Sequence, residues 1–369
     1  MRILVVNAGS SSLKLRLLDG ENAILGEEEL QAPEAQIDGA ALRRALGSPL
    51  AGAEAVGHRI VHGGERFRSA VPIDADVEAA IRELTDLAPL HQPKSLAALD
   101  AVTAVLPQLP AVACFDTAFH ATLPAAAATY ALPAEWRDRW RLRRYGFHGL
   151  SHAWIARRAP ELLGRPAQSL RIVSCHLGAG ASLCAIEGGR SLDTTMGFTP
   201  LEGLVMATRS GSVDPGMLLW LLEREGIGAS ELADALEHRS GLLGLSGTAD
   251  MRELLSRVDA EDREAQLGLE VYIRSLRAGI AAMVAALGGL DALVFTGGVG
   301  ERSSAVRELT VIGLEFLGLA IDAGCNRAPG GDADVSASRS SAATLVITAR
   351  EDLEIARQTR AALVAQKKS

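Results

Sequence analysis

The clearest pattern of apolar and polar positions lies in residues 1–20. Residues 3–6 form a continuous apolar run, which predicts a short buried strand. Residues 7–12, Asn-Ala-Gly-Ser-Ser-Ser, carry little side-chain bulk, and residues 13–17 then alternate leucine with basic residues. This order predicts a β-hairpin with a small polar turn. Such a turn is either an ordinary hairpin turn or a phosphate cradle of backbone N–H groups and hydroxyls, with Lys14 adding positive charge beside it.

The same order of segments returns later in the chain. Residues 172–189 consist of an apolar strand, a small-residue turn at 177–182, a second strand and a Glu-Gly-Gly end. A third version has an apolar run at 291–295, and residues 296–301, Thr-Gly-Gly-Val-Gly-Glu, are expected to form its turn. The repetition favours phosphate-binding turns over ordinary ones. It predicts a duplicated nucleotide-binding architecture in which two domains close on the phosphates.

Other segments show helical or strand periodicity. Residues 74–87 and 264–287 repeat apolar positions at helical spacing, and the stripe of the second helix is expected to face either the core or a subunit interface. Pro93 is expected to open a helix that ends at Leu106. Further helices are expected to start at Asp214, Ser303 and Glu351, Ser151 is expected to cap a helix through Ala159, and buried strands are expected within 53–64, 111–115, 190–195 and 344–348.

Length and composition narrow the class of protein. The 369 residues are many for one core, so two domains are expected. The formal net charge of −8 argues against a nucleic-acid partner, whose binding site is a basic patch. No apolar run has the length of a membrane span or a signal-peptide core, so no membrane partner is expected. The cysteines, Cys114, Cys175, Cys184 and Cys325, lack C-x-x-C spacing and suit a reducing, cytoplasmic location.

Arg59 is a candidate ligand-binding residue because it lies in an apolar strand. Burying an arginine there is costly unless it meets an anion. His58 and His62 flank it and are expected to be hydrogen-bonded structural histidines rather than catalytic groups. His91 and Gln92 stand at a helix break, where they either face a cleft, which we favour, or cap the turn.

Three further residues are candidates for phosphoryl-transfer chemistry. Asp116 directly follows the carboxyl end of a buried strand, where α/β sheets place functional groups, although a helix N-cap would look the same. His148 lies on a loop between two glycines. Arg209 is a strong cation on a glycine-flanked loop, which suits a clamp on a transferring phosphoryl group.

Taken together, these motifs resemble the acetate kinase family, a group of short-chain carboxylate kinases in the actin, hexokinase and Hsp70 superfamily. The resemblance covers nearly the whole chain. It rests on Asn-Ala-Gly-Ser-Ser-Ser-Leu-Lys from Asn7, Gly-His-Arg-Ile-Val-His-Gly-Gly from Gly57, Phe-Asp-Thr-Ala-Phe-His from Phe115, Tyr-Gly-Phe-His-Gly from Tyr145, the loop 193–215, and Thr-Gly-Gly-Val-Gly-Glu from Thr296.

The resemblance implies a role for each candidate residue. Asn7 and Glu351 would hold Mg²⁺, for which Mn²⁺ is an expected substitute. Arg59 would bind the substrate carboxylate, Asp116 would be the catalytic carboxylate, and His148 and Arg209 would stabilise the transferring phosphoryl group. The ATP and ADP site would comprise Ser10, Ser12, Lys14, His176, Leu177, Gly178, Ala179, Gly180, Asp250, Met251, Arg252, Gly298, Val299, Gly300, Glu301 and Arg302.

The implied fold has two duplicated α/β domains of the ribonuclease H-like, actin-like ATPase type around a central cleft. Residues 1–118 with 353–369 would form the N-terminal domain, and residues 121–350 the nucleotide-binding and dimerisation domain of a homodimer. The implied reaction is reversible Mg²⁺-dependent transfer from ATP to acetate, giving acetyl phosphate and ADP. A propionate kinase is the main alternative, and an ATPase without an acyl acceptor is another. The chain departs from the family pattern at Ala179, Gln92 and Arg302.

Overall fold

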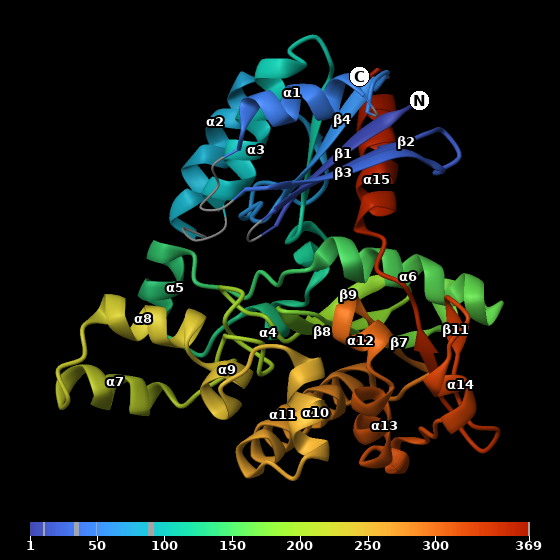
Figure 1. The fold of residues 1–369 in the computed structure, drawn as a ribbon. Coiled ribbons are helices and arrows are strands. Elements are labelled where there is room, and N and C mark those ends of the chain that lie inside the picture. Colours follow the sequence, from blue (N-terminus) through green and yellow to red (C-terminus); the bar gives the residue numbers. More distant parts are fainter. Residues whose placement is uncertain (10–11, 33–36, 49, 88–91, 368–369) are drawn as a thin grey trace. The chain divides into compact units, whose positions relative to one another are not determined.

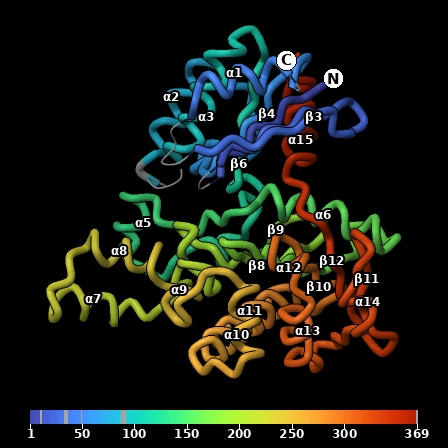
Figure 2. The backbone as a smooth tube through the Cα atoms, viewed as in Figure 1, coloured from blue at the N-terminus to red at the C-terminus, as the bar shows by residue number. Residues whose placement is uncertain are grey.

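The structure is a computed structural model that describes residues 1–369 except 10–11, 33–36, 49, 88–91 and 368–369. The chain forms two compact units. Unit 1 contains residues 1–121, 147–154 and 350–369, and unit 2 contains residues 122–146 and 155–349. The backbone therefore leaves unit 1, returns to it for eight residues, and ends in it, as the colours of Figure 2 allow the reader to follow.

Unit 1 is built on a six-stranded sheet with the order β3-β2-β1-β4-β6-β5. Figure 1 labels its strands β1 to β4. Strand β1 pairs antiparallel with β2 and parallel with β4, and β4 pairs parallel with β6. The strands are β1 (Ile3–Ala8), β2 (Ser12–Leu18), β3 (Ile24–Gln31), β4 (Ala55–Ile60), β5 (Val71–Pro72) and β6 (Ala111–Phe115); the helices are α1 (Gly39–Gly47), α2 (Ala75–Glu83), α3 (Gln92–Val105) and α15 (Glu351–Gln366).

Helices cover both faces of this sheet, and the alternation along β1 shows how. Leu4 and Val6 pack in one apolar cluster with residues of α1 and α3, whereas Ile3 and Val5 pack in another with Ile355 of α15. Successive side chains of a strand point to opposite faces, so a strand covered on both faces must be apolar throughout. This explains the continuous apolar run at residues 3–6.

Unit 2 is built on a second six-stranded sheet, with the order β11-β12-β10-β7-β8-β9. Its strands are β7 (Arg171–Leu177), β8 (Ala181–Glu187), β9 (Arg190–Thr194), β10 (Ala292–Thr296), β11 (Ala333–Asp334) and β12 (Ala343–Val346). Its helices are α4 (Ala125–Ala128), α5 (Ala134–Trp140), α7 (Pro215–Glu223), α8 (Ala229–His238), α9 (Gly241–Ser246), α10 (Met251–Asp259), α11 (Arg263–Leu287), α12 (Gly297–Arg302), α13 (Ser304–Ile312) and α14 (Ala323–Arg327), while α6 (Gly149–Leu163) is divided between the units.

The two sheets have the same strand order. Read from the opposite edge, the second sheet is β9-β8-β7-β10-β12-β11, so that β7 to β10 correspond to β1 to β4, and β12 corresponds to β6. Each unit begins with an antiparallel hairpin and continues into parallel strands. This duplication confirms the predicted fold class of two repeated α/β domains. None of the described helices is long and apolar enough to cross a membrane.

The helix expected at 264–287 is confirmed as α11, and its apolar stripe is buried in unit 2. It packs on β8, β7 and β9, with Leu269, Ile273, Leu276 and Ile280 buried. Asp262 caps its start by accepting hydrogen bonds from backbone N–H groups, and Gly288 ends it in a left-handed conformation. Of the two expected roles for this stripe, the structure therefore shows core packing.

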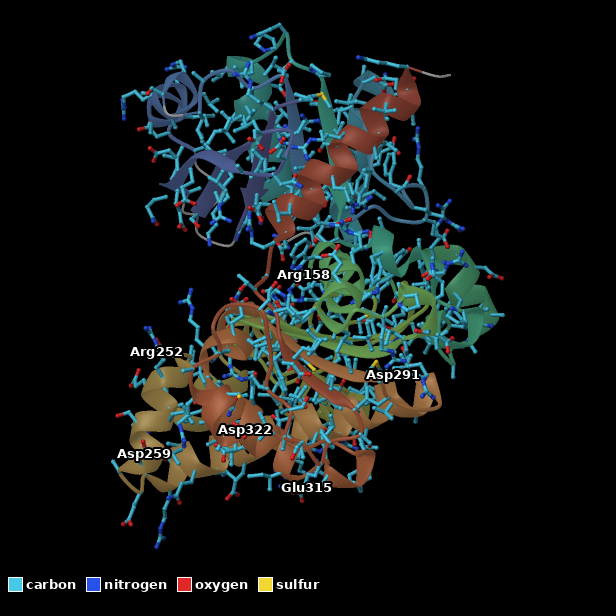
Figure 3. The ribbon with its side chains drawn as sticks, turned by 90° about the vertical axis from the view of Figure 1, so that its right-hand side faces the viewer. Arg158, Arg252, Asp259, Asp291, Glu315 and Asp322 are labelled. Atoms are coloured by element: carbon cyan, nitrogen blue, oxygen red, sulfur yellow. The ribbon has the colours of Figure 1, made fainter. Side chains whose placement is uncertain are left out.

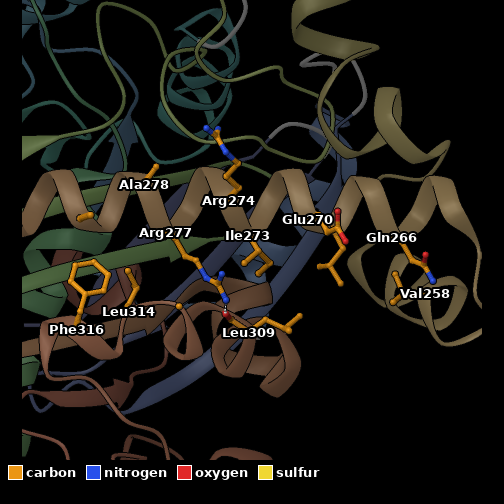
Figure 4. Close-up of a pocket in the computed structure, with 13 residues that line it drawn as sticks. Val258, Gln266, Glu270, Ile273, Arg274, Arg277, Ala278, Leu309, Leu314 and Phe316 are labelled. Atoms are coloured by element: carbon orange, nitrogen blue, oxygen red, sulfur yellow. Dashed lines mark hydrogen bonds between the residues drawn. The ribbon is translucent and has the colours of Figure 1, made fainter.

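A cavity of about 790 Å³ lies between α11 and α13 and is lined largely by apolar residues, including Ile273, Leu309 and Phe316 (Figure 4). The Arg277 guanidinium reaches across it and donates to the carbonyls of Leu309 and Thr310. These carbonyls belong to the last turn of α13, where a cation offsets the negative end of the helix dipole. Arg277 therefore fastens α13 to α11.

Two predictions of secondary structure are wrong. Residues 297–301 form the helix α12 and not a hairpin turn, because β10 corresponds to β4 of the first sheet and not to the hairpin strand β1. The Glu301 carboxylate fixes this helix by accepting from the N–H groups of Gly297 and Ala349, at 2.9 Å each. Ser151 does not cap a helix, because α6 already begins at Gly149, whose N–H donates to the Asp116 carbonyl at 2.9 Å.

Candidate active site

The centre of the candidate site in unit 1 is a pair formed by Arg59 and Asp116. Arg59 lies in β4, and Asp116 follows the parallel neighbour β6, so the register of the two strands brings them together. The Arg59 guanidinium donates from Nε (3.1 Å) and Nη2 (2.5 Å) to Oδ2 of Asp116. The anion that an arginine in an apolar strand requires is therefore supplied by the protein itself.

Asn7 and Glu351 extend this pair into a chain of four side chains. Arg59 Nη1 donates to Asn7 Oδ1 at 3.2 Å, and Asn7 Nδ2 donates to Glu351 Oε2 at 3.0 Å. Asn7 lies near the end of β1, and Glu351 is the first residue of α15. Residues from four distant parts of the sequence thus meet at the ends of three parallel strands and the start of one helix, the position where α/β sheets usually bind ligands.

The electrostatic interactions within this network are strong because Arg59 and Asp116 are largely buried. The side chains of Arg59 and Asp116 are 16% and 1% exposed. Burial alone would lower the pKa of Arg59, but the nearby carboxylates of Asp116 and Glu351 outweigh it and raise that pKa. Arg59 is therefore a permanent cation held among two carboxylates and an amide, a set of groups that can bind a carboxylate or an oxygen-coordinated metal ion.

His148 immediately precedes α6 and has an unusual backbone conformation. Its φ angle is 55°, in the left-handed region that side chains other than glycine seldom adopt. The following residue, Gly149, has no room for a Cβ, which would overlap the Asp116 carbonyl oxygen. The loop that carries His148 is thus packed tightly against the segment that carries Asp116.

The predicted phosphate residues of the first hairpin are placed as follows. Lys14 is exposed on β2, directly across the ladder from Asn7. The Ser12 hydroxyl donates to Glu29 at 2.6 Å, while its carbonyl accepts from Gly9 in the hairpin turn. Ser10 lies outside the described residues.

Two neighbouring polar residues, Gln92 and His62, have structural hydrogen bonds, whereas His58 lacks the one expected for it. The Gln92 side chain is buried and exchanges hydrogen bonds with the backbone of His62, so the prediction that it faces a cleft is wrong; His91 lies outside the described residues. The Nδ1 atom of His62 accepts from Gly64 at 2.9 Å, as expected of a structural histidine. His58 is buried, but neither ring nitrogen has a partner in the described part of the chain, so the expected hydrogen bond is absent there.

Unit 2 contains a separate cavity of about 610 Å³. The segments that line it come from the β7–β8 turn, the start of α10, and the region from α12 to the start of α13. Eight of the residues predicted to bind the nucleotide line it: Gly178, Ala179, Asp250, Met251, Arg252, Gly298, Val299 and Arg302.

Local structure explains how these segments present their polar groups. In the turn between β7 and β8, the Gly178 N–H donates to the Gly180 carbonyl at 2.9 Å. Asp250 caps α10 and pairs with Arg252, whose side-chain and backbone hydrogen bonds to the carboxylate hold the pKa of Asp250 down at about 2. Arg252 is 90% exposed, and Figure 3 shows it at the surface of unit 2. Exposed cations at the rim of a cavity suit a polyanionic ligand.

The other predicted nucleotide residues of unit 2, His176, Leu177, Gly180, Gly300 and Glu301, are not among the residues that line this cavity. His176 is part-buried in β7, beside the buried Leu177, and Gly180 closes the turn. Gly300 is buried within α12, and Glu301 is the carboxylate that fixes the start of that helix.

Arg209 lies in the long loop before α7 and is mostly buried. Its Nη1 donates to the Pro200 carbonyl at 2.7 Å, and its Nε lies 4.0 Å from the Glu237 carboxylate. Burial lowers its pKa, and Glu237 offsets part of that effect. Arginine side chains keep their charge in proteins, so the group stays positively charged.

Comparison with known proteins identifies the family. The sequence profile of the Acetokinase family matches residues 40–357. The chain belongs to this family. Among curated proteins, it is 42% identical over 392 residues to acetate kinase of Acetivibrio thermocellus, covering 97% of this chain and 98% of that protein.

Two solved structures extend the comparison. The crystal structure of Porphyromonas gingivalis acetate kinase has a TM-score of 0.89 and 36% identity, covering 98% of this chain and 99% of that one. A propionate kinase from Francisella tularensis has a TM-score of 0.90 and 34% identity, covering 97% and 99%. This acetokinase family member is thus similar over nearly its whole length to enzymes named for two different carboxylates.

Sequence reasoning did not assign several residues that line the cavity of this acetokinase family member. Ser303 was expected only as a helix cap, a role it has, and it also lines the cavity with Ser304 and Ala305. The available signal was a serine pair directly after a glycine-rich segment. Such a pair marks the start of a helix, whose free N–H groups then lie beside the glycine-rich segment. Ala249 and Leu255 carried no such signal.

Proposed function

We propose that this protein is an acetate kinase that transfers the γ-phosphoryl group of ATP to acetate, reversibly, giving acetyl phosphate and ADP. Membership of the acetokinase family supports the class of reaction. The observation that carries the proposal is Arg59, a part-buried cation in an apolar strand, connected to Asp116, Asn7 and Glu351. The planar guanidinium fork matches the geometry of a carboxylate such as acetate.

In the proposed reaction, Arg59 binds and orients the acetate carboxylate. The acetate carboxylate and Asp116 then compete for the N–H donors of the guanidinium, so acetate enters a site whose positive charge is already in place. An acetate oxygen attacks the γ-phosphorus in line, and the charge on the equatorial oxygens is met by His148 and Arg209. The cavity of unit 2 is the proposed site for ATP and ADP, with Arg252 and Arg302 near the phosphates.

We further propose that Mg²⁺ assists the reaction, with Mn²⁺ as a substitute. Among the described residues, no group of three His, Cys, Asp or Glu side chains forms a metal cluster. The oxygen set of Glu351, Asn7 and Asp116 nevertheless fits Mg²⁺, which takes one or two carboxylates and keeps several waters. When bound there, the ion would neutralise phosphate charge.

The metal proposal predicts the effect of Glu351→Ala. We expect this variant to need a much higher Mg²⁺ concentration for half-maximal rate, because one carboxylate ligand is lost. A Mg²⁺ titration of the rate at saturating ATP measures this. If the titration is unchanged, Glu351 serves only as a carboxylate at the start of α15, where it favours the helix dipole.

The test of the main proposal is a hydroxamate assay with ATP and a series of carboxylates. We expect the highest kcat/KM with acetate, lower values with propionate, and little turnover with butyrate. The similarity to a propionate kinase makes propionate the competing substrate, and a higher kcat/KM with propionate would reverse the assignment. ATP hydrolysis that does not depend on any carboxylate would instead indicate an ATPase without an acyl acceptor.

We also propose a homodimer in which α7 packs against a second copy. This helix is apolar on all sides, yet none of its residues is buried, and Met217, Leu219 and Trp220 are 44%, 57% and 52% exposed. A helix of that composition is normally covered. Two copies of the same apolar surface can cover one another about a two-fold axis.

We place the reaction in the cytoplasm. The four cysteines are free, and those in the strands, Cys114, Cys175 and Cys184, are buried. Free thiols suit a reducing compartment, and ATP, the proposed donor, is available there.

A further inference from the structure

His120 lies in the short 3₁₀ segment Ala118–Thr122, directly after Asp116, and only 1% of it is exposed. Its Nε2 atom lies 3.0 Å from the carbonyl oxygen of Phe147. A carbonyl oxygen only accepts hydrogen bonds, so Nε2 must carry the proton and donate. This contact fixes which ring nitrogen of His120 is protonated.

The accepting carbonyl belongs to the peptide group that precedes His148. The peptide group that follows His148 is also held, because the Gly149 N–H donates to the Asp116 carbonyl at 2.9 Å. The two peptide planes on either side of the His148 Cα are therefore both hydrogen-bonded to one segment, residues 116–120. Rotation about the two backbone bonds of His148 moves one or the other plane, so these contacts fix its conformation.

This conformation needs such support. His148 has a φ of 55°, which is unfavourable for a residue with a Cβ and persists only where the surroundings impose it. Phe147 is buried and its ring forms a T-shaped pair with the His62 ring, at 5.7 Å between centroids, so the loop has little room to move on that side. His120 is itself packed edge-on against His152 of α6, at 5.7 Å.

We infer that His120 is a positioning residue, which holds the Phe147–His148 peptide so that the His148 ring keeps its place relative to Asp116. The inference rests on the proposed function, in which His148 and Asp116 act on the transferring phosphoryl group. Of the two contacts, one uses the backbone of Asp116 and no substitution removes its acceptor. The other depends on the His120 side chain and can be tested directly.

The experiment compares three variants. His120→Gln keeps an N–H donor at the position of Nε2, whereas His120→Met keeps the bulk and removes the donor. His58→Met is the matched control, since His58 is equally buried in the same unit and neither ring nitrogen has a partner in the described residues. For each variant, kcat and KM for acetate and ATP are measured together with thermal stability.

We expect kcat to fall about tenfold in His120→Met, the size of one lost buried hydrogen bond, with KM for ATP nearly unchanged. His120→Gln should recover most of the rate, and His58→Met should retain it. A second measurement is the ¹⁵N-histidine NMR spectrum, with the His148 signal assigned by its loss in His148→Asn. That signal should move in His120→Met and stay in place in His120→Gln and His58→Met.

Equal losses of kcat in His120→Gln and His120→Met would overturn the inference, as would an unmoved His148 signal in His120→Met. If His120→Met does not fold, His120→Asn, whose amide is one bond too short to reach Phe147, replaces it in the comparison with His120→Gln. The NMR result does not require activity. A parent protein without acetate-dependent turnover would therefore refute the proposed function while the position of His148 is still tested.

Discussion

At the scale of single residues, two arginines predicted to be functional, one in each unit, differ in how their charge is neutralised. Arg59 is bonded directly to Asp116, whereas among the described residues Arg209 forms a longer ion pair with Glu237, whose carboxylate lies 4.0 Å from Nε. Arg209 otherwise donates to a neutral carbonyl, that of Pro200. A buried cation without a close counter-charge has more to gain from an approaching anion.

This contrast leads to a prediction for Arg209→Ala. We expect kcat to fall by about two powers of ten, because the charge is used on the phosphoryl group in the transition state. KM for acetate should change much less. Steady-state kinetics with acetate and ATP varied separately measure both constants, and an effect confined to KM for acetate would assign Arg209 to substrate binding instead.

The buried histidines of unit 1 predict a dependence of stability on pH. Burial lowers the pKa of His58 to about 3 and that of His62 to about 4, from an ordinary value of 6.5. Between those limits the unfolded chain binds protons that the folded chain does not, so the free energy of unfolding falls as pH falls below 6.5. Each such histidine contributes a slope of up to about 1.4 kcal/mol per pH unit.

His58→Met should reduce the slope of the free energy of unfolding against pH by the contribution of one histidine at most. The free energy of unfolding at pH 8 should stay similar or rise, since no hydrogen bond to a described residue is lost. Urea unfolding at pH 8, 6 and 5 measures the slope. If parent and variant lose stability in parallel, His58 is protonated equally in the folded and unfolded chains.

At the scale of elements, the attachment of α13 to α11 depends on a glycine, Gly313, whose lack of a side chain leaves room for Arg277. A Cβ at Gly313 would overlap the Arg277 guanidinium that holds the last turn of α13. We expect Gly313→Ala to displace the Arg277 guanidinium, to cost about 0.5–1.5 kcal/mol through loss of its hydrogen bonds to α13, and to lower Tm slightly. Gly330→Ala is the control, because nothing lies within 4 Å of a Cβ there. Equal Tm values for both variants would mean that α13 is held without Arg277.

The sequence was most informative where an element depends on its own residues. The two hairpins, the helix α11 and the caps at Asp214 and Ser303 all follow from local periodicity and capping side chains. The errors arise where a distant group decides. Helix α6 starts at Gly149 because the Gly149 N–H donates to the Asp116 carbonyl. Gln92 is buried because its side-chain amide exchanges hydrogen bonds with the backbone of His62.

The candidate site shows the same limit. Asn7, Arg59, Asp116 and Glu351 were each singled out from sequence, partly by family resemblance, and the structure joins them in one network. Their mutual bonds could not be predicted, because they depend on the register of β4 against β6 and on the docking of α15. The placement of His148 by His120 was missed for this reason, since no local pattern relates the two residues.

At the scale of the whole molecule, the same strand order appears twice, but the two units carry different chemistry at the ends of their strands. Unit 1 has the charged network of Arg59 and Asp116, whereas unit 2 has a cavity lined by small residues and exposed arginines. The repeated fold was predictable from the repeated hairpin motif. The exchange of residues 147–154 into unit 1 was not, because it follows from packing between segments far apart in sequence.

The proposed assembly gives a prediction at this scale. Trp220→Glu should convert the protein from a dimer to a monomer, because a charge on α7 would be buried in the contact. Phe316→Glu is the control, since Phe316 is 76% exposed and lies at the other apolar surface of unit 2, the α11–α13 cavity. Light scattering coupled to gel filtration measures the mass. Dissociation by Phe316→Glu and not by Trp220→Glu would move the interface to α11.

The cover of the first sheet has a consequence for protein synthesis. One face is closed by α1 and α3, which are translated among its strands, but the other is closed by α15, which follows all of unit 2. On the ribosome, α15 is therefore not yet present to cover Ile3, Val5 and Cys114 while residues 122–349 are synthesised, which takes roughly 10–45 s. We therefore expect the part of the protein that is synthesised first to become stable last, with its apolar face open to chaperones during that interval.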